Sequence, residues 1–387
     1  MRTIYLDNGA TTKIDPKVLE AMQPYMTEKY GNASSTHHKG QEAKIALEDA
    51  RSLIAKSINA KPEEIIFTSG GTESNNLAIK GLAFANSRKG KHIITTNIEH
   101  DCVLNACKWL ETQGFKVTNI NVDKEGFIDP AKLEKAITKD TILVSMIHGN
   151  NEIGTIQDIK SLGEICRRKG VFFHIDACQS YTKTEIDVRK HNLDLVTINS
   201  HKIHGPKGVG ALYIRKGINI TPLAHGGGHE QNLRSGTENV PSIVGFAKAV
   251  RIADKGHARQ MVKMRDYLIE KVLKIPETYL NGPSGDKNGD RRLCNNANFR
   301  FSYVEGEAIG GYLDAKGICS STGSACSSRS LEPSHVLMAI GLKPEEAHGS
   351  LRLTISRFTT KEEVDYVLSV LPGVIKKLRA ISSLGGF

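Results

Sequence analysis

The sequence predicts an α/β protein with a large domain, built on a mostly parallel sheet covered by helices, and a smaller α+β domain. Short apolar strands alternate with amphipathic helices from about residue 60 to residue 198, a pattern typical of parallel strands joined by helical crossovers. The length of 387 residues exceeds that of one ordinary core. A turn-rich stretch over residues 281–290 precedes a second unit with a different pattern.

Strands are predicted in the first unit where short apolar runs end in polar or turn-forming residues. They cover residues 64–69, 92–96, 115–120, 141–146, 171–176 and 194–198. Helices are predicted over residues 78–84, 103–112, 130–138 and 158–169, and a long helix near 240–273. Ligands of such sheets bind beyond the carboxyl ends of the strands, so we expect the functional site at that edge.

The second unit predicts a mixture of strands and helices. Strands are expected over residues 295–301 and 348–356, a helix over 305–316, and a final helix from Lys361. The apolar residues of the final helix fall on one stripe, which indicates a face packed on a core.

Composition and charge exclude several classes of protein. No apolar run reaches the roughly 20 residues needed to span a bilayer, and the first residues contain no apolar leader, so we expect a cytoplasmic protein that does not bind membranes. The net charge of +10 comes from basic residues interleaved with acidic ones, so we expect no direct nucleic-acid binding. Seven scattered cysteines indicate reduced thiols rather than a disulfide framework.

The segment from Thr68 to Asn76 joins a predicted strand to a predicted helix and combines glycines with hydroxyl side chains. Glycines let backbone amides approach an anion, Thr72 or Ser74 can donate a hydrogen bond, and the start of the helix supplies free amides. The segment matches neither a P-loop nor a dinucleotide fingerprint. It predicts a phosphate cradle, and the alternative is a plain capped turn.

Asp176 ends an apolar strand, where an ionised carboxylate is costly unless a cation or several donors meet it. The protonated ring nitrogen of pyridoxal phosphate is such a partner, and the pairing makes the cofactor a better electron sink. Gln179, three residues further on, is within reach of the ring hydroxyl of that cofactor. The alternative is that Asp176 caps the segment that follows.

Lys202 lies in the segment Asn199-Ser-His-Lys-Ile-His-Gly-Pro, directly after a predicted strand. A lysine that forms a Schiff base needs a lowered pKa, which burial and nearby cations provide. Ser200 and His201 would face the phosphate, and Gly205-Pro206 would turn the chain away. The alternative for any single lysine is a solvated surface charge, but the flanking residues favour the cofactor lysine.

Cys326 lies in a run of small residues, Ser321-Thr-Gly-Ser-Ala-Cys-Ser-Ser, which predicts an exposed loop. Such a loop suits a thiol that carries a group from a buried substrate to an outside acceptor. Cys294, Cys319 and Cys326 could instead bind an iron–sulfur cluster, but their spacing is irregular and includes no Cys-x-x-Cys. His225 and His229 resemble a metal pair, although the three glycines between them favour a loop.

Taken together, these segments resemble the cysteine desulfurases of the NifS and IscS type, in the class V aminotransferase group of fold-type I pyridoxal-phosphate enzymes. The resemblance runs nearly end to end. It is carried by ordered motifs at residues 5–12, 30–35, 72–76, 99–100, 150–154, 176–179, 200–202, 234–239, 323–326 and 351–358. The short form of the cysteine segment resembles the IscS-like branch more than the SufS-like branch. Three positions depart from the family pattern: Gly9, Gly71 where alanine is usual, and Cys178 beside Asp176.

The resemblance implies an aspartate aminotransferase-like fold with a seven-stranded type of sheet. The large cofactor-binding domain would cover residues 16–260, and the small domain would combine residues 1–15 with 261–387 and carry the Cys326 loop. It also implies a homodimer, in which Thr237 reaches the phosphate in the neighbouring subunit, and an IscU-like iron–sulfur scaffold protein as sulfur acceptor. No stable metal site is implied, and Cys326 would be at most a transient cluster ligand with the scaffold.

The resemblance also assigns roles to individual residues. Lys202, Cys326 and His100 are the catalytic residues it implies, with His100 stacked on the pyridine ring. The implied contacts to pyridoxal phosphate are Gly71, Thr72, His100, Asn151, Asp176, Gln179, Asn199, Ser200, His201, Lys202 and Thr237. Arg352 and Asn151 would bind the substrate, because a guanidinium can hold a carboxylate through two hydrogen bonds.

The expected reaction takes sulfur from L-cysteine, releases L-alanine and leaves a persulfide on Cys326. Lys202 or His100 would move the α-proton, and the Cys326 thiolate would attack the sulfur. A selenocysteine lyase or a cysteine-sulfinate desulfinase is the alternative within enzymes, since either would use the same cofactor with less need for Cys326.

Overall fold

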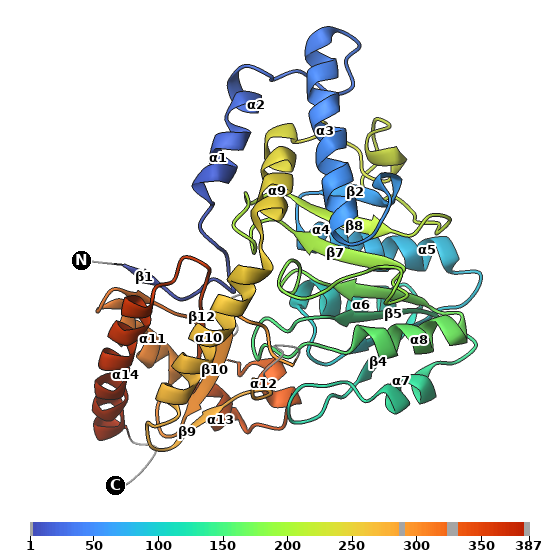
Figure 1. The fold of residues 1–387 in the computed structure, drawn as a ribbon. Helices are drawn as coiled ribbons and strands as arrows, with labels where there is room; N and C mark the ends of the chain where they lie inside the picture. Colours follow the sequence, from blue (N-terminus) through green and yellow to red (C-terminus); the bar gives the residue numbers. More distant parts are fainter. Residues whose placement is uncertain (1–2, 286–290, 323–331, 383–387) are drawn as a thin grey trace.

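The computed structural model describes residues 3–285, 291–322 and 332–382. Its main sheet has seven strands in the order β2-β8-β7-β6-β5-β3-β4 (Figure 1). All neighbouring strands pair in parallel except β8, which is antiparallel to both β2 and β7. The strands are β2 (Ile65–Thr68), β3 (His92–Thr96), β4 (Lys116–Ile120), β5 (Thr141–Ile147), β6 (Phe172–Asp176), β7 (Leu195–Asn199) and β8 (Gly210–Ile214). The predicted α/β class with a mostly parallel sheet is therefore confirmed.

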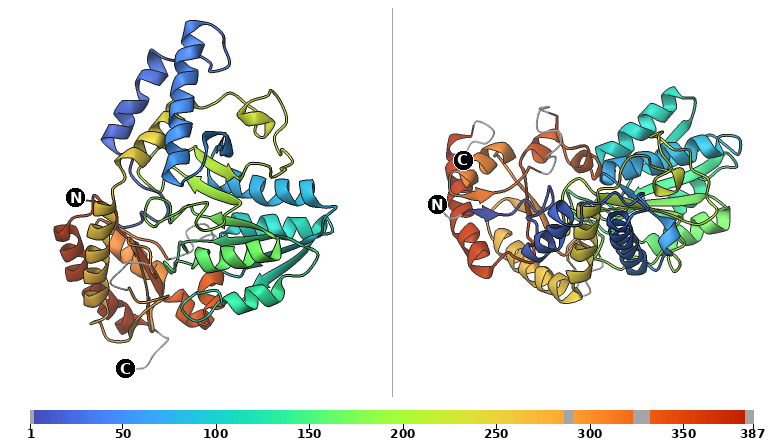
Figure 2. Two further views of the ribbon diagram at one scale, coloured as in Figure 1. Left: turned by 45° about the vertical axis from the view of Figure 1, so that its right-hand side comes forward. Right: turned by 90° about the horizontal axis from the view of Figure 1, so that it is seen from above.

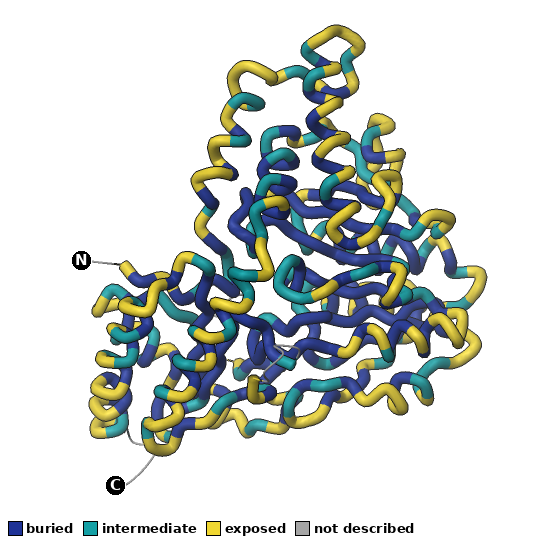
Figure 3. The backbone as a smooth tube through the Cα atoms, viewed as in Figure 1, coloured by how far each residue is buried: buried dark blue, intermediate teal, exposed yellow. Residues whose placement is uncertain are grey.

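Helices cover both faces of this sheet (Figure 2). On one face, α5 (Leu82–Asn86) and α6 (Asp101–Thr112) bury residues such as Leu82 and Leu110 in one apolar cluster. The other face packs on a larger cluster. Its helices are α1 (Pro16–Met22), α3 (His38–Ser57), α7 (Pro130–Ala136), α8 (Ile159–Lys169) and α9 (Val240–Ile252). Burial on both faces explains why β5 and β7 consist entirely of buried residues (Figure 3).

A second unit has its own apolar core, which includes Leu6, Phe299 and Leu371. It combines the antiparallel sheet β12-β10-β9 with the parallel pair β1-β11. The start of the chain therefore lies beside its final third (Figure 1). The elements are β1 (Ile4–Tyr5), α10 (Lys255–Val272), β9 (Thr278–Leu280), β10 (Asn296–Phe301), α11 (Gly306–Asp314), β11 (Ile318–Cys319), β12 (Ser350–Thr354) and α14 (Lys361–Ile381).

The predicted stripe on α14 is buried at Val364, Val367, Leu371, Ile375 and Leu378, while Leu368 is only partly buried. Two short helices, α12 (His335–Ala339) and α13 (Pro344–His348), follow the undescribed residues 323–331. Val336 and Leu337 of α12 belong to the apolar cluster of the main sheet, not to that of the second unit. Helix α12 therefore packs on the core of the main sheet.

Two helix predictions need correction. The long helix expected near 240–273 is two helices, because Ala253 and Asp254 adopt extended conformations and the Asp254 side chain accepts a hydrogen bond from Gly256 N. The helix expected over 78–84 is part of a longer one. It comprises α4 (Gly71–Asn76), a π-helical turn (Leu77–Gly81) and α5.

Helix α2 (Pro24–Thr27) and the start of α3 project from the body of the molecule (Figures 1 and 3). The exposed residues of this region include Leu19, Met26 and Ile45 on the three helices and Tyr30 between α2 and α3. In the described part of the chain, no helix combines the length and the apolar character that crossing a membrane requires.

Candidate functional site

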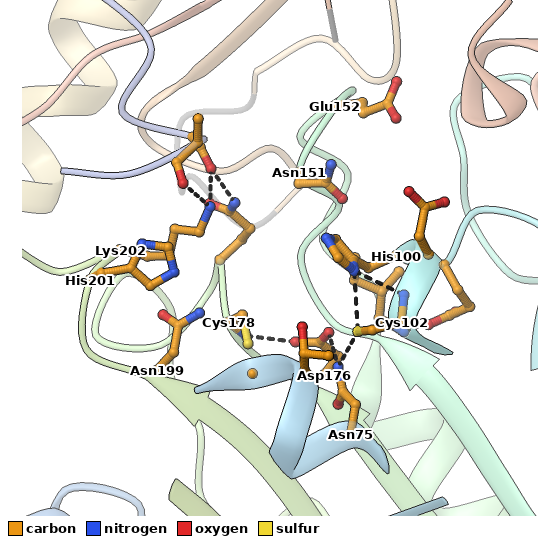
Figure 4. Close-up of a pocket in the computed structure, with 18 of the residues that line it drawn as sticks. Asn75, His100, Cys102, Asn151, Glu152, Asp176, Cys178, Asn199, His201 and Lys202 are labelled. Atoms are coloured by element: carbon orange, nitrogen blue, oxygen red, sulfur yellow. Dashed lines mark hydrogen bonds between the residues drawn. The ribbon is translucent and has the colours of Figure 1, made fainter. Parts of the chain in front are cut away.

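A cavity of about 430 Å³ lies at the carboxyl ends of the parallel strands, which is the edge that the sequence predicted and a size that suits a small ligand. Its walls come from the residues that follow β3, β5, β6 and β7, from the start of α4 and from β12 of the second unit (Figure 4). The lining includes Gly9, Gly71, Thr72, Asn75, Glu99, His100, Cys102, Asn151, Glu152, Asp176, Cys178, Gln179, Asn199, His201, Lys202 and Arg352.

The predicted phosphate cradle forms one end of this cavity. Gly70 has φ 152° and ψ −173°, a conformation open almost only to glycine, and it turns the chain from β2 into α4. Gly71 and Thr72 line the cavity at the first turn of that helix. Ser74 does not, because it is fully buried and its hydroxyl pairs with Thr68 Oγ1 at 2.7 Å. Of these two hydroxyl residues, only Thr72 therefore borders the cavity.

Asp176 ends β6 on the floor of the cavity and is 4% exposed. Its Oδ2 accepts a hydrogen bond from Asn75 Nδ2 at 2.7 Å, and its Oδ1 accepts one from Cys178 N at 2.9 Å. Through the bond with Cys178 N, Asp176 also caps the segment that follows it, which was the alternative role for this residue. Gln179 Nε2 donates to the carbonyl of Gly9 at 2.8 Å. A buried carboxylate that faces a cavity suits a cationic ring nitrogen.

Lys202 reaches into the cavity from the segment after β7 (Figure 4). Its Nζ donates to the carbonyl of Gly9 and to that of Ala10, the latter at 2.6 Å. Burial, with the Arg352 cation as the next cause, lowers the pKa of Lys202 to about 8. Lys202 is therefore not a solvated surface lysine, which was the alternative interpretation of the sequence. An amine with such a pKa is nucleophilic close to neutral pH.

His201 lines the cavity beside Lys202, and its Nδ1 lies 3.1 Å from Thr11 Oγ1. Burial and the nearby Lys202 lower the pKa of His201 to about 4, so the ring is neutral at physiological pH. A neutral ring can still donate one N–H bond to an anion.

His100 is the N-cap residue of α6, and its Nδ1 accepts a hydrogen bond from Cys102 N at 3.2 Å. Cys102 Sγ lies 3.1 Å from the same Nδ1 and 3.2 Å from Asn75 Nδ2. Neither Asn75 nor Cys102 is among the predicted site residues. Asn75 joins the site through Asp176, which lies far from it in the chain, whereas Cys102 lies only two residues from His100 and no local pattern marked its thiol.

Arg352 is 2% exposed on β12, where the second unit closes the cavity. Its Nη1 donates to the carbonyl of Asn151 at 3.0 Å, and its Nη2 lies 2.9 Å from Asp7 Oδ1. Asp7 follows β1 and is a further residue that the sequence prediction did not include. A ligand carboxylate that binds Arg352 must share or displace this pairing.

Two buried acids complete the wall opposite Lys202. Glu99 Oε1 accepts hydrogen bonds from Thr96 Oγ1 at 2.5 Å and Ile147 N at 3.0 Å, and burial raises the pKa of Glu99 to about 8. Burial also raises the pKa of Glu152, whose Oε2 accepts from Ser334 Oγ at 2.5 Å. Glu99 therefore favours its protonated form near neutral pH, and Glu152 holds its proton to higher pH than an ordinary carboxyl group does.

Most of the predicted site residues converge on this cavity, with three departures. Ser200 is fully buried but does not line it, and among the described residues its hydroxyl has no hydrogen-bond partner. Thr237 is exposed and lies outside it. Cys326 belongs to residues 323–331, outside the described residues.

The residues present fit pyridoxal phosphate. The cradle at Gly71 and Thr72, the buried Asp176 carboxylate and the Lys202 amine all border one cavity, and they correspond to the phosphate, ring nitrogen and aldehyde of that cofactor. Asn199 Oδ1 is buried with no hydrogen-bond partner among the described residues, so a polar group remains to be satisfied beside the cavity.

Metal binding finds no support in the described ranges. Across residues 3–285, 291–322 and 332–382, no group of three or more His, Cys, Asp or Glu side chains could hold a metal ion. The segment from His225 to His229 is a loop, as its glycines predicted.

Comparisons with known proteins agree with this geometry. The profile of the aminotransferase class-V family matches residues 4–367. The cysteine desulfurase IscS of Dictyoglomus turgidum is 54% identical over 98% of this chain and 96% of its own length. The IscS of Methanosarcina thermophila is 53% identical over 99% of this chain and 94% of its own length.

Solved structures give the same result. A NifS-like protein is 38% identical with a TM-score of 0.91, covering 97% of this chain and all of its own. A structure of SspA in complex with cysteine is also 38% identical, with a TM-score of 0.82 and coverage of 92% of this chain and all of its own.

Proposed function

This chain belongs to the class-V aminotransferase family, and we propose that it is a pyridoxal-phosphate-dependent cysteine desulfurase. It takes sulfur from L-cysteine, releases L-alanine and supplies the sulfur for iron–sulfur cluster assembly. The observation that carries this proposal is the convergence of Lys202, Asp176 and Arg352 on one cavity. These residues provide an amine for the cofactor aldehyde, a carboxylate for its ring nitrogen and a guanidinium for a substrate carboxylate.

When bound, pyridoxal phosphate supplies an electron sink that stabilises negative charge at the substrate α-carbon. Gly71, Thr72 and His201 would hold its phosphate, with Ser200 supporting that end from below the surface of the cavity. Asp176 would hold the protonated ring nitrogen and Gln179 the ring hydroxyl. Asn151, Asn199 and the His100 ring would border the remaining sides.

Lys202 Nζ is suited to move the substrate α-proton. Its pKa of about 8 leaves a substantial neutral fraction near neutral pH, so the amine can accept a proton and return it. Asp176 is buried at the floor of the same cavity, where its carboxylate would hold the cationic ring nitrogen. His100 borders the cavity as the second group that can exchange a proton.

Arg352 orients the substrate through its carboxylate. A bidentate guanidinium–carboxylate pair fixes both distance and plane, which places the substrate sulfur consistently. Because Asp7 is 2.9 Å from Arg352 Nη2, substrate binding competes with an ion pair that the protein already makes. The carbonyl of Asn151 holds the other arm of Arg352 in place.

Sulfur transfer is assigned to Cys326. Its thiolate attacks the substrate sulfur, the carbon–sulfur bond breaks, and a sulfur–sulfur bond forms, so L-cysteine and the thiol become L-alanine and a persulfide. The described residues on either side of the Cys326 segment are anchored at the cavity. Ser321 exchanges backbone hydrogen bonds with Arg352, and His335 Nε2 donates to the carbonyl of Glu99 at 2.9 Å.

The same proposal includes the assembly and the partners. The exposed position of Thr237 supports a homodimer in which this residue serves the neighbouring site. The persulfide would pass to an IscU-like scaffold protein, where Cys326 would ligate the nascent cluster transiently. The protein would act in the cytoplasm.

Purified protein loaded with pyridoxal phosphate should convert L-cysteine to L-alanine and, with dithiothreitol as acceptor, release sulfide. Cys326→Ala should abolish this turnover, whereas Cys166→Ala, which removes a buried thiol far from any predicted role, should not. Normal turnover by Cys326→Ala would disprove the assignment of that residue. Faster turnover of selenocysteine or cysteine sulfinate than of cysteine would favour the alternative lyases.

A further inference from the structure

We propose that Asn75 and Cys102 form a hydrogen-bonded bridge that joins Asp176 to the unprotonated Nδ1 of His100. Both are positioning residues, because they act through Asp176 and His100. The inference rests on the proposed function for its effect on rate, but the bridge itself can be tested without turnover.

The bridge consists of three contacts in series (Figure 4). Asn75 Nδ2 donates to Asp176 Oδ2 at 2.7 Å and to Cys102 Sγ at 3.2 Å. Cys102 Sγ in turn lies 3.1 Å from His100 Nδ1. Asn75 is fully buried, so water does not compete for its contact with Asp176.

The carboxylate of Asp176 fixes the orientation of the Asn75 amide. A side-chain amide has a nitrogen that donates two hydrogen bonds and an oxygen that only accepts. If the amide were rotated by half a turn, its oxygen would face the Asp176 carboxylate, and two acceptors would be in contact. The nitrogen therefore faces Asp176, and its second hydrogen is available to Cys102 Sγ.

The backbone fixes the direction of the remaining bond. Cys102 N can only donate, and it lies 3.2 Å from His100 Nδ1, so Nδ1 carries a lone pair rather than a proton. The Cys102 thiol then donates to Nδ1, while Asn75 donates to the sulfur. A neutral His100 must carry its proton on Nε2.

The consequence concerns how His100 exchanges protons. With Nδ1 engaged by two donors from the start of α6, a neutral His100 can give up its proton only from Nε2. The bridge also ties the ring of His100 to the carboxylate that holds the cofactor. Loss of one neutral hydrogen bond of this kind is expected to lower a rate that depends on it by about 2- to 12-fold.

The test compares Cys102→Ala and Cys102→Ser with Cys107→Ala. Cys107 lies on the same helix and is buried in the apolar cluster away from the cavity, so it controls for loss of a buried thiol. In protein without cofactor, the infrared difference between wild type and Cys102→Ala isolates one S–H stretching band. We expect this band at a lower frequency than that of a free thiol, and Asn75→Ala should shift it while Cys107→Ala should not.

Two further readouts follow the bridge to His100. Nitrogen NMR with labelled histidine, assigned through a His100 variant, should show an unprotonated Nδ1 in wild type and also in Cys102→Ala, because the backbone amide of residue 102 remains. The Nδ1 signal should shift in the variant, which loses the thiol donor. With cofactor and L-cysteine, Cys102→Ala should lower kcat about 2- to 12-fold with little change in KM. Cys102→Ser should recover part of this loss, because a hydroxyl can donate the same bond.

An S–H band of Cys102 at the free-thiol frequency, or a proton on His100 Nδ1, would overturn the bridge. So would equal rates for Cys102→Ala and Cys107→Ala. If Asn75→Ala does not fold, the Cys102 variants alone decide the question. If wild-type protein does not release alanine from cysteine, the proposed function fails, but the infrared and NMR results still accept or reject the bridge.

Discussion

Gly71 and Cys178 occupy adjoining space under the cofactor cavity, which leads to a quantitative prediction about Gly71→Ala. A Cβ atom at position 71 would lie 2.6 Å from Cys178 Sγ, far inside the contact distance of carbon and sulfur. Overpacking a buried site typically costs about 1–3 kcal/mol. For domains near the larger end of the measured range, this corresponds to a fall in Tm of about 2–6 °C.

The double variant tests whether this one contact is the cause. Gly71→Ala combined with Cys178→Ala should recover most of the loss, so the two changes should couple by at least about 1 kcal/mol. Gly311→Ala on α11 is the control, because no atom lies within 4 Å of its added Cβ. Thermal unfolding of the protein without cofactor measures these three variants, together with Cys178→Ala alone, which completes the cycle.

Two results would refute this reasoning. Gly71→Ala could be as stable as wild type while Cys178 is unchanged, or the double variant could be no more stable than the single one. Either result would mean that the two departures from the family pattern are independent. The predicted result would mean that a small residue at position 71 accommodates the thiol at position 178.

Three further predictions concern the charged groups of the cavity. Lys202 should bind pyridoxal phosphate faster as pH rises through about 8, because burial lowers the pKa of Lys202 to that value and only the neutral amine attacks the aldehyde. Borohydride trapping and peptide mass spectrometry would measure the rate. A rate that falls as pH rises would contradict this expectation. Asp7→Asn should lower KM for cysteine several-fold, because it removes the carboxylate that competes with the substrate for Arg352. The control Asp15→Asn, which breaks the ion pair with Arg357, should leave KM unchanged. An unchanged KM in Asp7→Asn would argue against Arg352 as the site that binds the substrate carboxylate. Burial raises the pKa of Glu99 to about 8 in the folded protein, so the folded state binds more protons than the unfolded state from about pH 4.5 to 8, and the stability that Glu99 contributes is lost as pH rises across that window. Glu99→Gln should therefore flatten the dependence of Tm on pH. An unchanged slope would be evidence that Glu99 ionises normally.

The sequence predicted the main sheet well where local pattern and burial agree. β5 and β6 are short apolar runs because both faces of a parallel sheet are covered. β8 was not predicted as a strand, since Gly210 and Ala211 carry little β-propensity and the segment follows directly on the Lys202 motif. The connection from β7 over residues 200–209 contains no crossover helix, which is consistent with the antiparallel pairing of β8.

The candidate site was predicted where a single short segment carries the signal. Asp176 ends β6 and Lys202 follows β7, so the topology brings them to one edge. Asp7, Asn75 and Cys102 were not predicted. Asp7 and Asn75 contact side chains far away in the chain, and Cys102 joins Asn75 to His100, although it lies only two residues from His100. Asp7 can pair with Arg352 because β1, at the start of the chain, pairs with β11 of the second unit.

Helix limits show the same division between local and tertiary causes. The break between α9 and α10 lies at Asp254, whose side chain caps α10 and could be recognised in the sequence. Its extended backbone also depends on tertiary structure, because α9 packs on one apolar core and α10 on the other. The assignment of residues 16–260 to one domain, and of residues 1–15 and 261–387 to the other, stays a prediction.

We propose that one protein removes sulfur from L-cysteine at the Lys202 cavity and holds it on Cys326. Mass spectrometry of intact protein after one turnover with L-cysteine, without reductant, tests this proposal, with alanine measured in the same sample. We expect one added sulfur per chain, located on the peptide that contains Cys326, together with one equivalent of alanine. Alanine formed with the added sulfur on another cysteine, or no alanine from protein that has bound pyridoxal phosphate at Lys202, would contradict it.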